Sequence, residues 1–281
     1  MAFAINTNVA ALNSYRNLSN TQNDISKSLE KLSTGLRINR AADDAAGLSI
    51  SEGLRSQVNG LNVAARNAQD GISVIQTAEG ALTEVHSILQ RMRDLAVQGA
   101  NDSNNAEART AIEKEAGELS KELHRITEST NFNGIDLLKG GDLTFQVGAD
   151  GNANNAINVT LANVGTSVGA LASADGIAAG TGFAVTDNAA AQATITGIDT
   201  AIKAISAERS NLGASQNRFE TAIKSINISA ENLSASESRI RDTDMASEMA
   251  KFTKNQIMSQ AGTAMLAQAN QINQGVLQLL G

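Results

Sequence analysis

Apolar residues at both ends of the chain recur at alternating spacings of four and three, which is typical of a helix that packs against partner helices. Near the C-terminus the positions between them hold Gln, Asn, Ser, Thr, Ala and Gly, and residues 255–281 carry no charged side chain. Such a face needs a partner that removes it from water. The residues of these two stripes are Leu18, Ile25, Leu29 and Leu32 at the N-terminal end, and Met258, Met265, Ile272, Val276 and Leu279 at the C-terminal end.

Similar stripes predict helices along most of the remaining chain. The stripe from Leu54 to Ala96 would form a helix of roughly 65 Å at about 1.5 Å per residue. A second stripe, which ends at Leu95, indicates that the later half of this helix is buried on two sides. The helices are predicted over residues 5–36, 54–96, 112–126 and 198–240, with a further helix up to the C-terminus.

The middle of the chain has a different character, because residues 140–202 contain no Lys, Arg or Glu and are rich in Gly, Asn, Thr and Ala. Residues 143–147 and 157–161 alternate between apolar and polar side chains on either side of an Asp150–Gly151 turn signal. This pattern predicts a β-hairpin. Residues 165–195 are predicted to be loop, with a second, weak strand pair near Phe183–Val185.

The order of these elements is nearly symmetric about the middle of the chain. It predicts a mainly α fold, in which long heptad-patterned helices from both ends pack as an elongated rod, with a small central β-hairpin region. The predicted organisation has terminal helices in residues 1–40 and 241–281, a joint segment in 41–55, and a rod domain in 56–240 whose β region covers about 131–197.

Composition supports extended helical packing. At about 5% usage, a chain of this length would hold roughly 14 Pro, whereas this one has none. Aromatic residues make up 2% of the chain and Trp is absent, so burial must come from Ala, Leu, Ile and Val. The absence of Cys excludes disulfides and thiolate sites. A net charge of −7 and a pI near 5.0 argue against a nucleic-acid partner, because such binding relies on basic patches.

Targeting and membrane signals are also missing from the sequence. Residues 1–8 lack a basic segment followed by a continuous apolar one, and no stretch approaches the about 20 apolar residues of a membrane span. We therefore expect neither a cleaved precursor nor a membrane anchor, and any export must read an uncleaved N-terminus. A membrane-active C-terminal helix would have a polar face rich in Lys and Arg, which this one lacks.

Residue patterns typical of catalysis or cofactor binding are not found. His86 and His124 lie on different predicted helices and in no metal-ligand spacing, and no phosphate-binding glycine motif occurs. Asp43 and Asp44 are adjacent, so they would point to different faces, and capping of a helix start is their expected role. The sequence therefore predicts no enzyme, no catalytic residue, no cofactor and no metal.

Heptad stripes alone most often indicate a helical bundle within one molecule. A monomeric bundle, however, would carry a charged face toward solvent, and the C-terminal helix has none. The pattern therefore favours burial between molecules, and burial within one molecule remains the alternative.

Several motifs in the two terminal thirds are specific to one family. They are Ile5–Asn8, Ser28–Asn39, Asp43–Leu48, Arg66–Gly71, Glu248–Lys251 and Ala267–Gln271, together with the shorter Phe132–Gly134 and Phe145–Gly148. On these motifs the chain resembles the bacterial flagellins, the subunits of the flagellar filament. The variable outer domains of that family are nearly missing here, so no large outer domain is expected.

The resemblance implies an extracellular filament, a homopolymer that serves motility. The terminal helices would form its inner tube and the longer helices its outer tube, with a joint between them. The resemblance also implies export through the flagellar type III apparatus, an export chaperone that covers the C-terminal helix, and contacts with the filament cap and hook–filament junction proteins. The alternative is a hook–filament junction component or another secreted, flagellum-associated helical protein that forms no long polymer.

One further segment matches a family pattern. Residues 90–98, Gln-Arg-Met-Arg-Asp-Leu-Ala-Val-Gln, resemble the helix surface that the vertebrate innate receptor TLR5 recognises in many flagellins. The resemblance implies that Gln90, Arg91, Leu95 and Glu115 contact this receptor in a vertebrate host and are also buried between subunits. The alternative is that these residues serve packing alone.

Overall fold

The computed structural model describes residues 8–173, 175 and 182–279. The chain divides into two compact units. Unit 1 combines Met1–Ser56 with Glu231–Gly281, and unit 2 comprises Gln57–Ala230. No helix in the described ranges combines the length and apolarity that crossing a bilayer requires.

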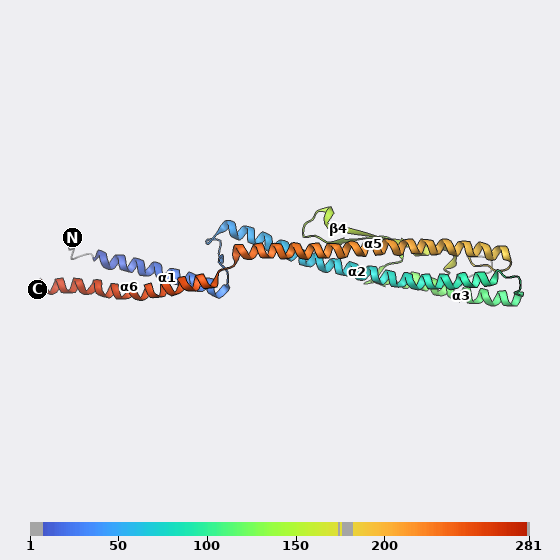
Figure 1. Cartoon of the computed structure of the whole chain (residues 1–281). Helices are drawn as coiled ribbons and strands as arrows, with labels where there is room; N and C mark the ends of the chain where they lie inside the picture. The colour runs from blue at the N-terminus through green and yellow to red at the C-terminus, as the bar shows by residue number, and fades with distance from the viewer. Residues whose placement is uncertain (1–7, 174, 176–181, 280–281) are drawn as a thin grey trace. The chain divides into compact units, whose positions relative to one another are not determined.

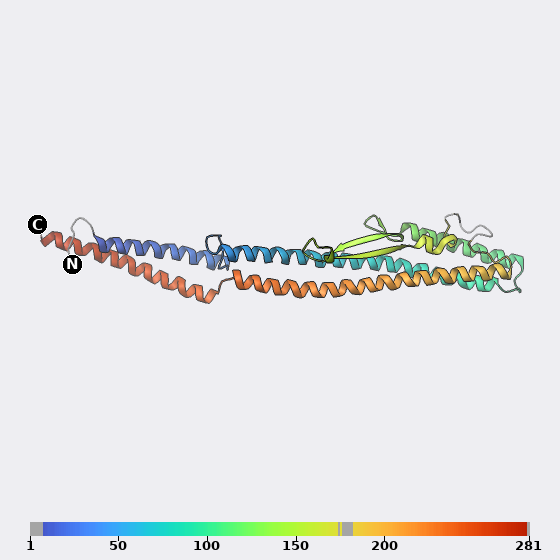
Figure 2. The same cartoon turned by 90° about the horizontal axis from the view of Figure 1, so that it is seen from above.

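In unit 1 the terminal helices α1 (Val9–Thr34) and α6 (Met245–Leu279) run antiparallel, side by side (Figures 1 and 2). The Asn8 side-chain amide donates to the carbonyl of Ala269, and the Ser28 hydroxyl donates to the Glu248 carboxylate, so the two helices pair in opposite directions. Asn8 also caps α1 by accepting from the backbone N–H of Ala11. These contacts bring the two distant ends of the chain into one helix pair.

Backbone hydrogen bonds join the two connections of unit 1. The N–H of Arg37 donates to the carbonyl of Arg241, and that of Thr243 donates to the carbonyl of Gly35. Gly35 itself ends α1 in the left-handed region, with a φ of 74°, which glycine adopts without steric cost. The connection after α1 is thereby fixed to the segment that directly precedes α6.

The two adjacent aspartates have different local roles. Helix α2 covers Ala45–Gly99, and Asp44 Oδ1 accepts from the backbone N–H of Gly47 at 2.9 Å, so the predicted capping role is confirmed for Asp44. Asp43 instead accepts from the N–H groups of Asn39 and Arg40, in the turn before the helix. The hydrogen bond from Arg40, and then that from Asn39, holds the pKa of the Asp43 carboxyl below its usual value.

Unit 2 is built on α2, α3 (Ala106–Ser129) and α5 (Asn188–Arg241), which lie side by side in both views (Figures 1 and 2). Its core is mostly aliphatic. The exceptions are Phe183, Phe219 and Met92, whose exposed fractions are 1% or less. Arg93 of α2 pairs with Asp199 of α5 at 2.7 Å at the edge of this core. The core confirms the expectation that burial comes mainly from Ala, Leu, Ile and Val.

The predicted hairpin is confirmed as β3 (Lys139–Gln146) and β4 (Ala156–Asn163), which pair antiparallel with Leu143 opposite Val159. Alternate residues of β4 are buried, and the Phe145 ring of β3 meets Phe219 of α5 edge to face, with centroids 5.4 Å apart. A smaller hairpin precedes it, formed by β1 (Asn131–Phe132) and β2 (Ile135–Asp136).

Three details of the middle region differ from the prediction. The chain at Phe183–Val185 is buried but is not a strand, because side chains satisfy its backbone: Ala184 donates to Thr194 and Val185 to Glu113. The predicted second strand pair is therefore wrong there.

Part of the predicted loop is helical. It forms α4 (Val164–Val168) and the 3-10 turn η2 (Gly169–Leu171), and a further 3-10 turn, η1 (Ala153–Asn155), precedes β4. Helix α5 begins at Asn188 rather than at Ile198.

Candidate assembly surface on the terminal helices

The seam between α1 and α6 is formed mainly by polar and small residues. Thr21 and Ser28 of α1 are 8% and 5% exposed, and Glu248 and Ala269 of α6 are 5% and 9% exposed. Gly262 faces the Leu18 side chain, and a Cβ added there would lie 3.4 Å from it, which is an ordinary van der Waals distance. The fully buried positions of the seam therefore contribute little apolar burial.

A buried charged hydrogen bond fixes this seam. Ser28 Oγ donates to Glu248 Oε1 at 2.6 Å, and Lys251 Nζ lies 3.3 Å from Glu248 Oε2. The hydrogen bond from Ser28, followed by the effects of Lys251 and Lys31, lowers the pKa of Glu248 below its usual value despite burial. Glu248 is therefore ionised at neutral pH, and the Ser28 hydroxyl and the two lysines stabilise its negative charge.

Leu18, Ile25, Leu32, Phe252 and Leu266 of the terminal helices are partly buried, whereas nine other large apolar side chains are exposed. Their exposed fractions range from 46% at Met245 to 66% at Tyr15. The exposed set comprises Val9, Leu12, Tyr15 and Leu29 on α1, and Met245, Met249, Ile257, Met258 and Met265 on α6. Among the described residues of unit 1, the buried apolar side chains are only Ile38 and Ala269. The fully buried positions of this helix pair are therefore mostly polar, and much of its apolar surface remains exposed.

This arrangement divides the stripes that the sequence predicted as single faces. On α1, Leu29 is 51% exposed, whereas Leu18, Ile25 and Leu32 are partly buried. On α6, Gly262 and Ala269 face α1, while Met258 and Met265 are 50% and 63% exposed beside the seam. Helix α6 continues to Leu279, but the side chains of Ile272, Val276 and Leu279 lie outside the part of the chain whose side chains are described.

Besides Tyr15, five members of the exposed set lie outside the two terminal stripes predicted from sequence. Two of them are the methionines at 245 and 249, which are four residues apart and therefore share a face of α6. That spacing is the signal that could have revealed them. The other three are Val9, Leu12 and Ile257.

The residues predicted to contact a receptor lie in unit 2, and the structure brings three of them to the surface. Arg91 Nε donates to Glu115 Oε1 at 2.9 Å, which joins α2 to α3, and the Gln90 amide lies 2.9 Å from the His86 ring. Both members of the Arg91–Glu115 pair are about half exposed. Leu95, in contrast, is 2% exposed and belongs to the core of unit 2, so its side chain is not part of this surface.

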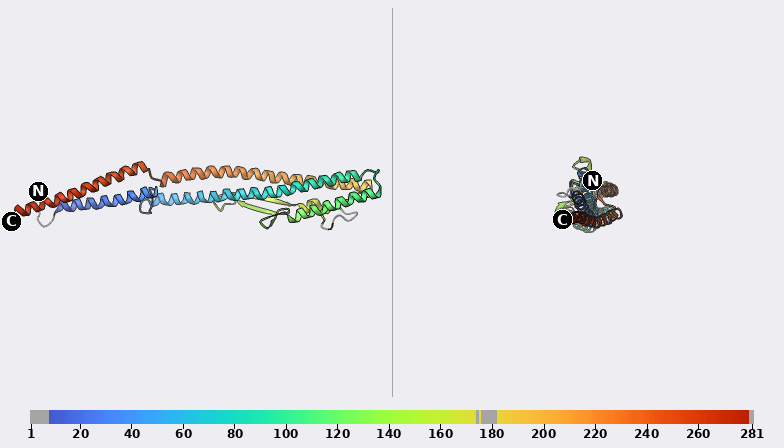
Figure 3. Two further views of the ribbon diagram at one scale, coloured as in Figure 1. Left: turned by 90° about the horizontal axis from the view of Figure 1, so that it is seen from below. Right: turned by 90° about the vertical axis from the view of Figure 1, so that its left-hand side faces the viewer.

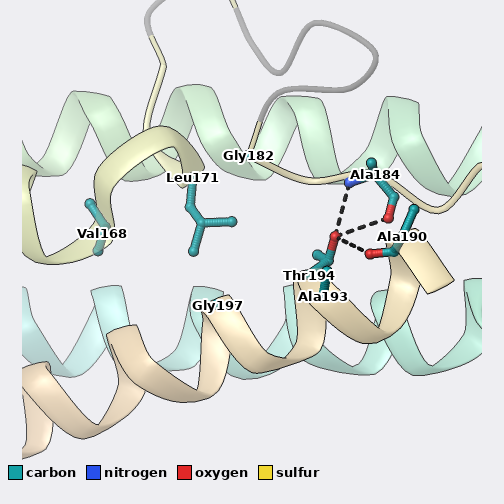
Figure 4. A pocket seen from close by; sticks show the side chains of 8 residues that line it. All are labelled: Val168, Leu171, Gly182, Ala184, Ala190, Ala193, Thr194 and Gly197. Carbon is teal, nitrogen blue, oxygen red and sulfur yellow. Dashed lines mark hydrogen bonds between the residues drawn. The ribbon is translucent and has the colours of Figure 1, made fainter.

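A hollow of about 430 Å³ in unit 2 lies between η2 and the start of α5 (Figure 4). The described residues that line it are small or aliphatic, apart from Thr194. The Thr194 hydroxyl accepts from the N–H of Ala184 and lies within hydrogen-bond distance of the carbonyls of Ala184 and Ala190, as the dashed lines show. Its hydrogen-bonding capacity is used by backbone groups, so this hollow offers no side chain suited to acid–base or nucleophilic chemistry.

Across the described ranges, no cluster of three His, Asp or Glu side chains is placed to hold a metal ion.

Comparison with known proteins identifies the family. Residues 5–142 match the bacterial flagellin N-terminal helical region, and residues 195–280 match the bacterial flagellin C-terminal helical region. The flagellin of Halalkalibacterium halodurans is 51% identical over 278 residues, and that of Bacillus subtilis is 48% identical over 305 residues. The flagellar filament 33 kDa core protein of Treponema phagedenis is 46% identical over 288 residues, and each of these comparisons covers 98% of this chain and 99% of the relative. The chain therefore belongs to the bacterial flagellin family.

Proposed function

We propose that this protein is a structural subunit that self-assembles into the extracellular filament of the bacterial flagellum and serves motility. Its membership of the flagellin family supports this role, as does the name of the Treponema phagedenis relative, a flagellar filament core protein. The observation that carries the proposal is the exposed apolar surface of the α1–α6 pair, formed by nine large apolar side chains that are 46–66% exposed. Copies of the same chain are the partners that would cover these faces.

The energetics of this surface favour growth from an existing polymer over the pairing of two free subunits. Burying a large aliphatic side chain completely is worth about 1.5–3 kcal/mol, so a side chain that is already half buried gains about 1 kcal/mol. Nine such side chains together give a gain of the same order as the about 4–15 kcal/mol that association costs in lost freedom. A subunit that adds to a filament end contacts several neighbours at once, whereas a pair of subunits covers only part of the surface.

We further propose that the protein reaches the filament through the flagellar type III apparatus in an unfolded form. Before export, a chaperone would cover the C-terminal helix, which carries no charged side chain after Lys254. The chain has no Pro and no Cys, so neither slow prolyl isomerisation nor disulfide exchange would delay folding after export. The filament cap and hook–filament junction proteins would bind the same terminal faces at the ends of the polymer.

The surface around Arg91 and Glu115 is the proposed contact for TLR5 in a vertebrate host. Gln90 lies next to Arg91, and all three side chains are exposed on α2 and α3. Leu95 would act beneath this surface, by packing α2 onto the core rather than by touching the receptor. The same exposed side chains would be covered by neighbouring subunits in the filament, as the family resemblance implies.

Seeded elongation tests the main proposal. Purified subunits are mixed with sheared filament fragments, and growth is followed by electron microscopy. Tyr15 is the only tyrosine of a chain without Trp and is 66% exposed, so its fluorescence reports the change in its surroundings on burial. We expect long filaments and a change in emission that stops when free subunits are depleted. Subunits that attach to fragment ends without elongating them would instead support the junction-protein alternative.

A further inference from the structure

The methionines of this chain are distributed unevenly between its interior and its surface. The sequence has six, of which Met1 lies outside the described residues and Met92 is fully buried in the core of unit 2. The remaining four all lie on α6. Met245, Met249, Met258 and Met265 have exposed fractions of 46%, 49%, 50% and 63%. A flexible apolar side chain is seldom this exposed four times on one helix unless the surface has a partner.

These four side chains form two pairs. Met245 and Met249 are four residues apart, and Met258 and Met265 are seven apart, so the members of each pair share a face of α6. Both pairs lie outside the seam that holds Glu248, Gly262 and Ala269 against α1. In the free subunit, therefore, an oxidant in solution can reach all four sulfur atoms.

We propose that Met245, Met249, Met258 and Met265 are oxidation sites through which a peroxide blocks assembly of the free subunit. In this reaction an S–O bond forms as the O–O bond of hydrogen peroxide breaks. The sulfur loses two electrons to the peroxide, and the second oxygen leaves as water with both hydrogen atoms. Each thioether becomes a sulfoxide. The effect on assembly rests on the function proposed above, whereas the selectivity of the oxidation rests on the exposure of the side chains alone.

The consequence for assembly follows from solvation. A sulfoxide is polar and remains hydrated on the exposed face of a free subunit, so oxidation costs the subunit itself little. When a neighbouring subunit covers that face, the sulfoxide oxygen loses its water, and the apolar surface that drives association is reduced. Oxidised subunits are therefore excluded from the growing polymer. Subunits already in the polymer hold the same sulfur atoms away from the oxidant.

The first test maps where oxidation occurs. Free subunits and assembled filaments are treated with the same dose of hydrogen peroxide, and sulfoxide at each methionine is quantified by peptide mass spectrometry. In the free subunit we expect the four α6 methionines to react and Met92 to be spared. In the filament we expect the α6 methionines to react at least about tenfold more slowly, in proportion to their burial. Oxidation of Met92 as fast as Met265, or equal rates in subunit and filament, would overturn the proposal.

The second test measures assembly. Peroxide treatment of the wild-type subunit should raise the concentration needed for seeded growth by about tenfold or more. A variant with all four α6 methionines replaced by leucine retains Met1 and Met92. The leucines can change the concentration that this variant needs for seeded growth. That concentration should nevertheless be the same before and after peroxide treatment. Equal loss in both proteins would refute the role of these four sites. If untreated wild-type subunits fail to elongate seeds, the proposed function is wrong. The oxidation map of the free subunit then still tests which methionines react.

Discussion

The buried Ser28–Glu248 hydrogen bond offers a direct test of how the terminal helices are held. The Ser28→Ala substitution removes the hydroxyl and leaves the buried Glu248 carboxylate without the hydrogen bond that this hydroxyl donates. Hydrogen bonds to charged groups contribute about 1.5–3 kcal/mol. Lys251 compensates only in part, because its side chain is 64% exposed and its ion pair with Glu248 is screened by water. We therefore expect the α1–α6 pair to lose about 1.5–3 kcal/mol of local stability.

Amide hydrogen exchange of the free subunit measures this loss, because it reports opening of α1 and α6 separately from the core of unit 2. An effect of this size accelerates exchange about 10- to 150-fold near residues 28 and 248. The matched control is Ser26→Ala, since Ser26 lies on the same helix but is exposed and bonds only to the Gln22 carbonyl. If Ser28→Ala exchanges no faster than Ser26→Ala, the seam does not depend on this hydrogen bond.

The same contact gives the helix pair a dependence on pH. The folded state lowers the pKa of Glu248 relative to its usual value of 4.5, mainly through the hydrogen bond from Ser28. Its contribution is therefore complete above pH 4.5 and is lost as the pH falls through the lowered folded pKa. Exchange from α1 should accelerate in this acidic range in the wild type. The Glu248→Gln variant, which has no carboxylate there, should show a flatter profile, and identical profiles would contradict the assignment.

Three other changes separate assembly, core and receptor surface. Met265→Asp should abolish seeded elongation without changing the circular dichroism or melting of unit 2. The same result is expected for Ile272→Asp and Leu279→Asp, which belong to the stripe predicted from sequence. Normal filaments from these variants would count against the proposed surface. Phe219→Ala should destabilise unit 2 by about 3–5 kcal/mol in urea unfolding, because this fully buried ring packs on Phe145. Arg91→Ala should cost less than about 1 kcal/mol of stability, since its pair with Glu115 is exposed. The same variant should reduce TLR5 signalling in reporter cells, whereas Arg125→Ala, which removes a similarly exposed ion pair within α3, should not.

Most helices could be predicted from sequence because the alternating spacing persists over many turns. The start of α5 could not, since its first residues include Ala189, Ala190 and Ala191, which add no stripe of large apolar residues. The available signal was local: Asp187 accepts from the backbone N–H of Ala190 and so caps the helix. A search for caps as well as periodicity would have placed the boundary there.

The candidate surface was less predictable, because periodicity defines a face but not what covers it. The spacing of Met258, Gly262, Met265 and Ala269 fits a single stripe, yet the small residues pack on α1 and the methionines do not (Figure 3 shows how α1 and α6 run together). Which members pair depends on how closely the two backbones approach each other, and a sequence pattern does not contain that distance. Leu95 shows the opposite case, since its place on a second apolar stripe of α2 already indicated the burial that the structure shows.

The two units obtain their stability from different sources, and this difference bears on assembly. Unit 2 encloses a continuous core that includes Leu82, Leu89 and Phe219, so it needs no neighbour to fold. The α1–α6 pair has almost no apolar core of its own and relies on directed contacts such as that between Ser28 and Glu248. Directed contacts set the register of two helices but contribute little net stability. Covering the outer apolar faces adds burial that the free subunit lacks, so amide exchange from α1 and α6 should be slower in the filament than in the free subunit.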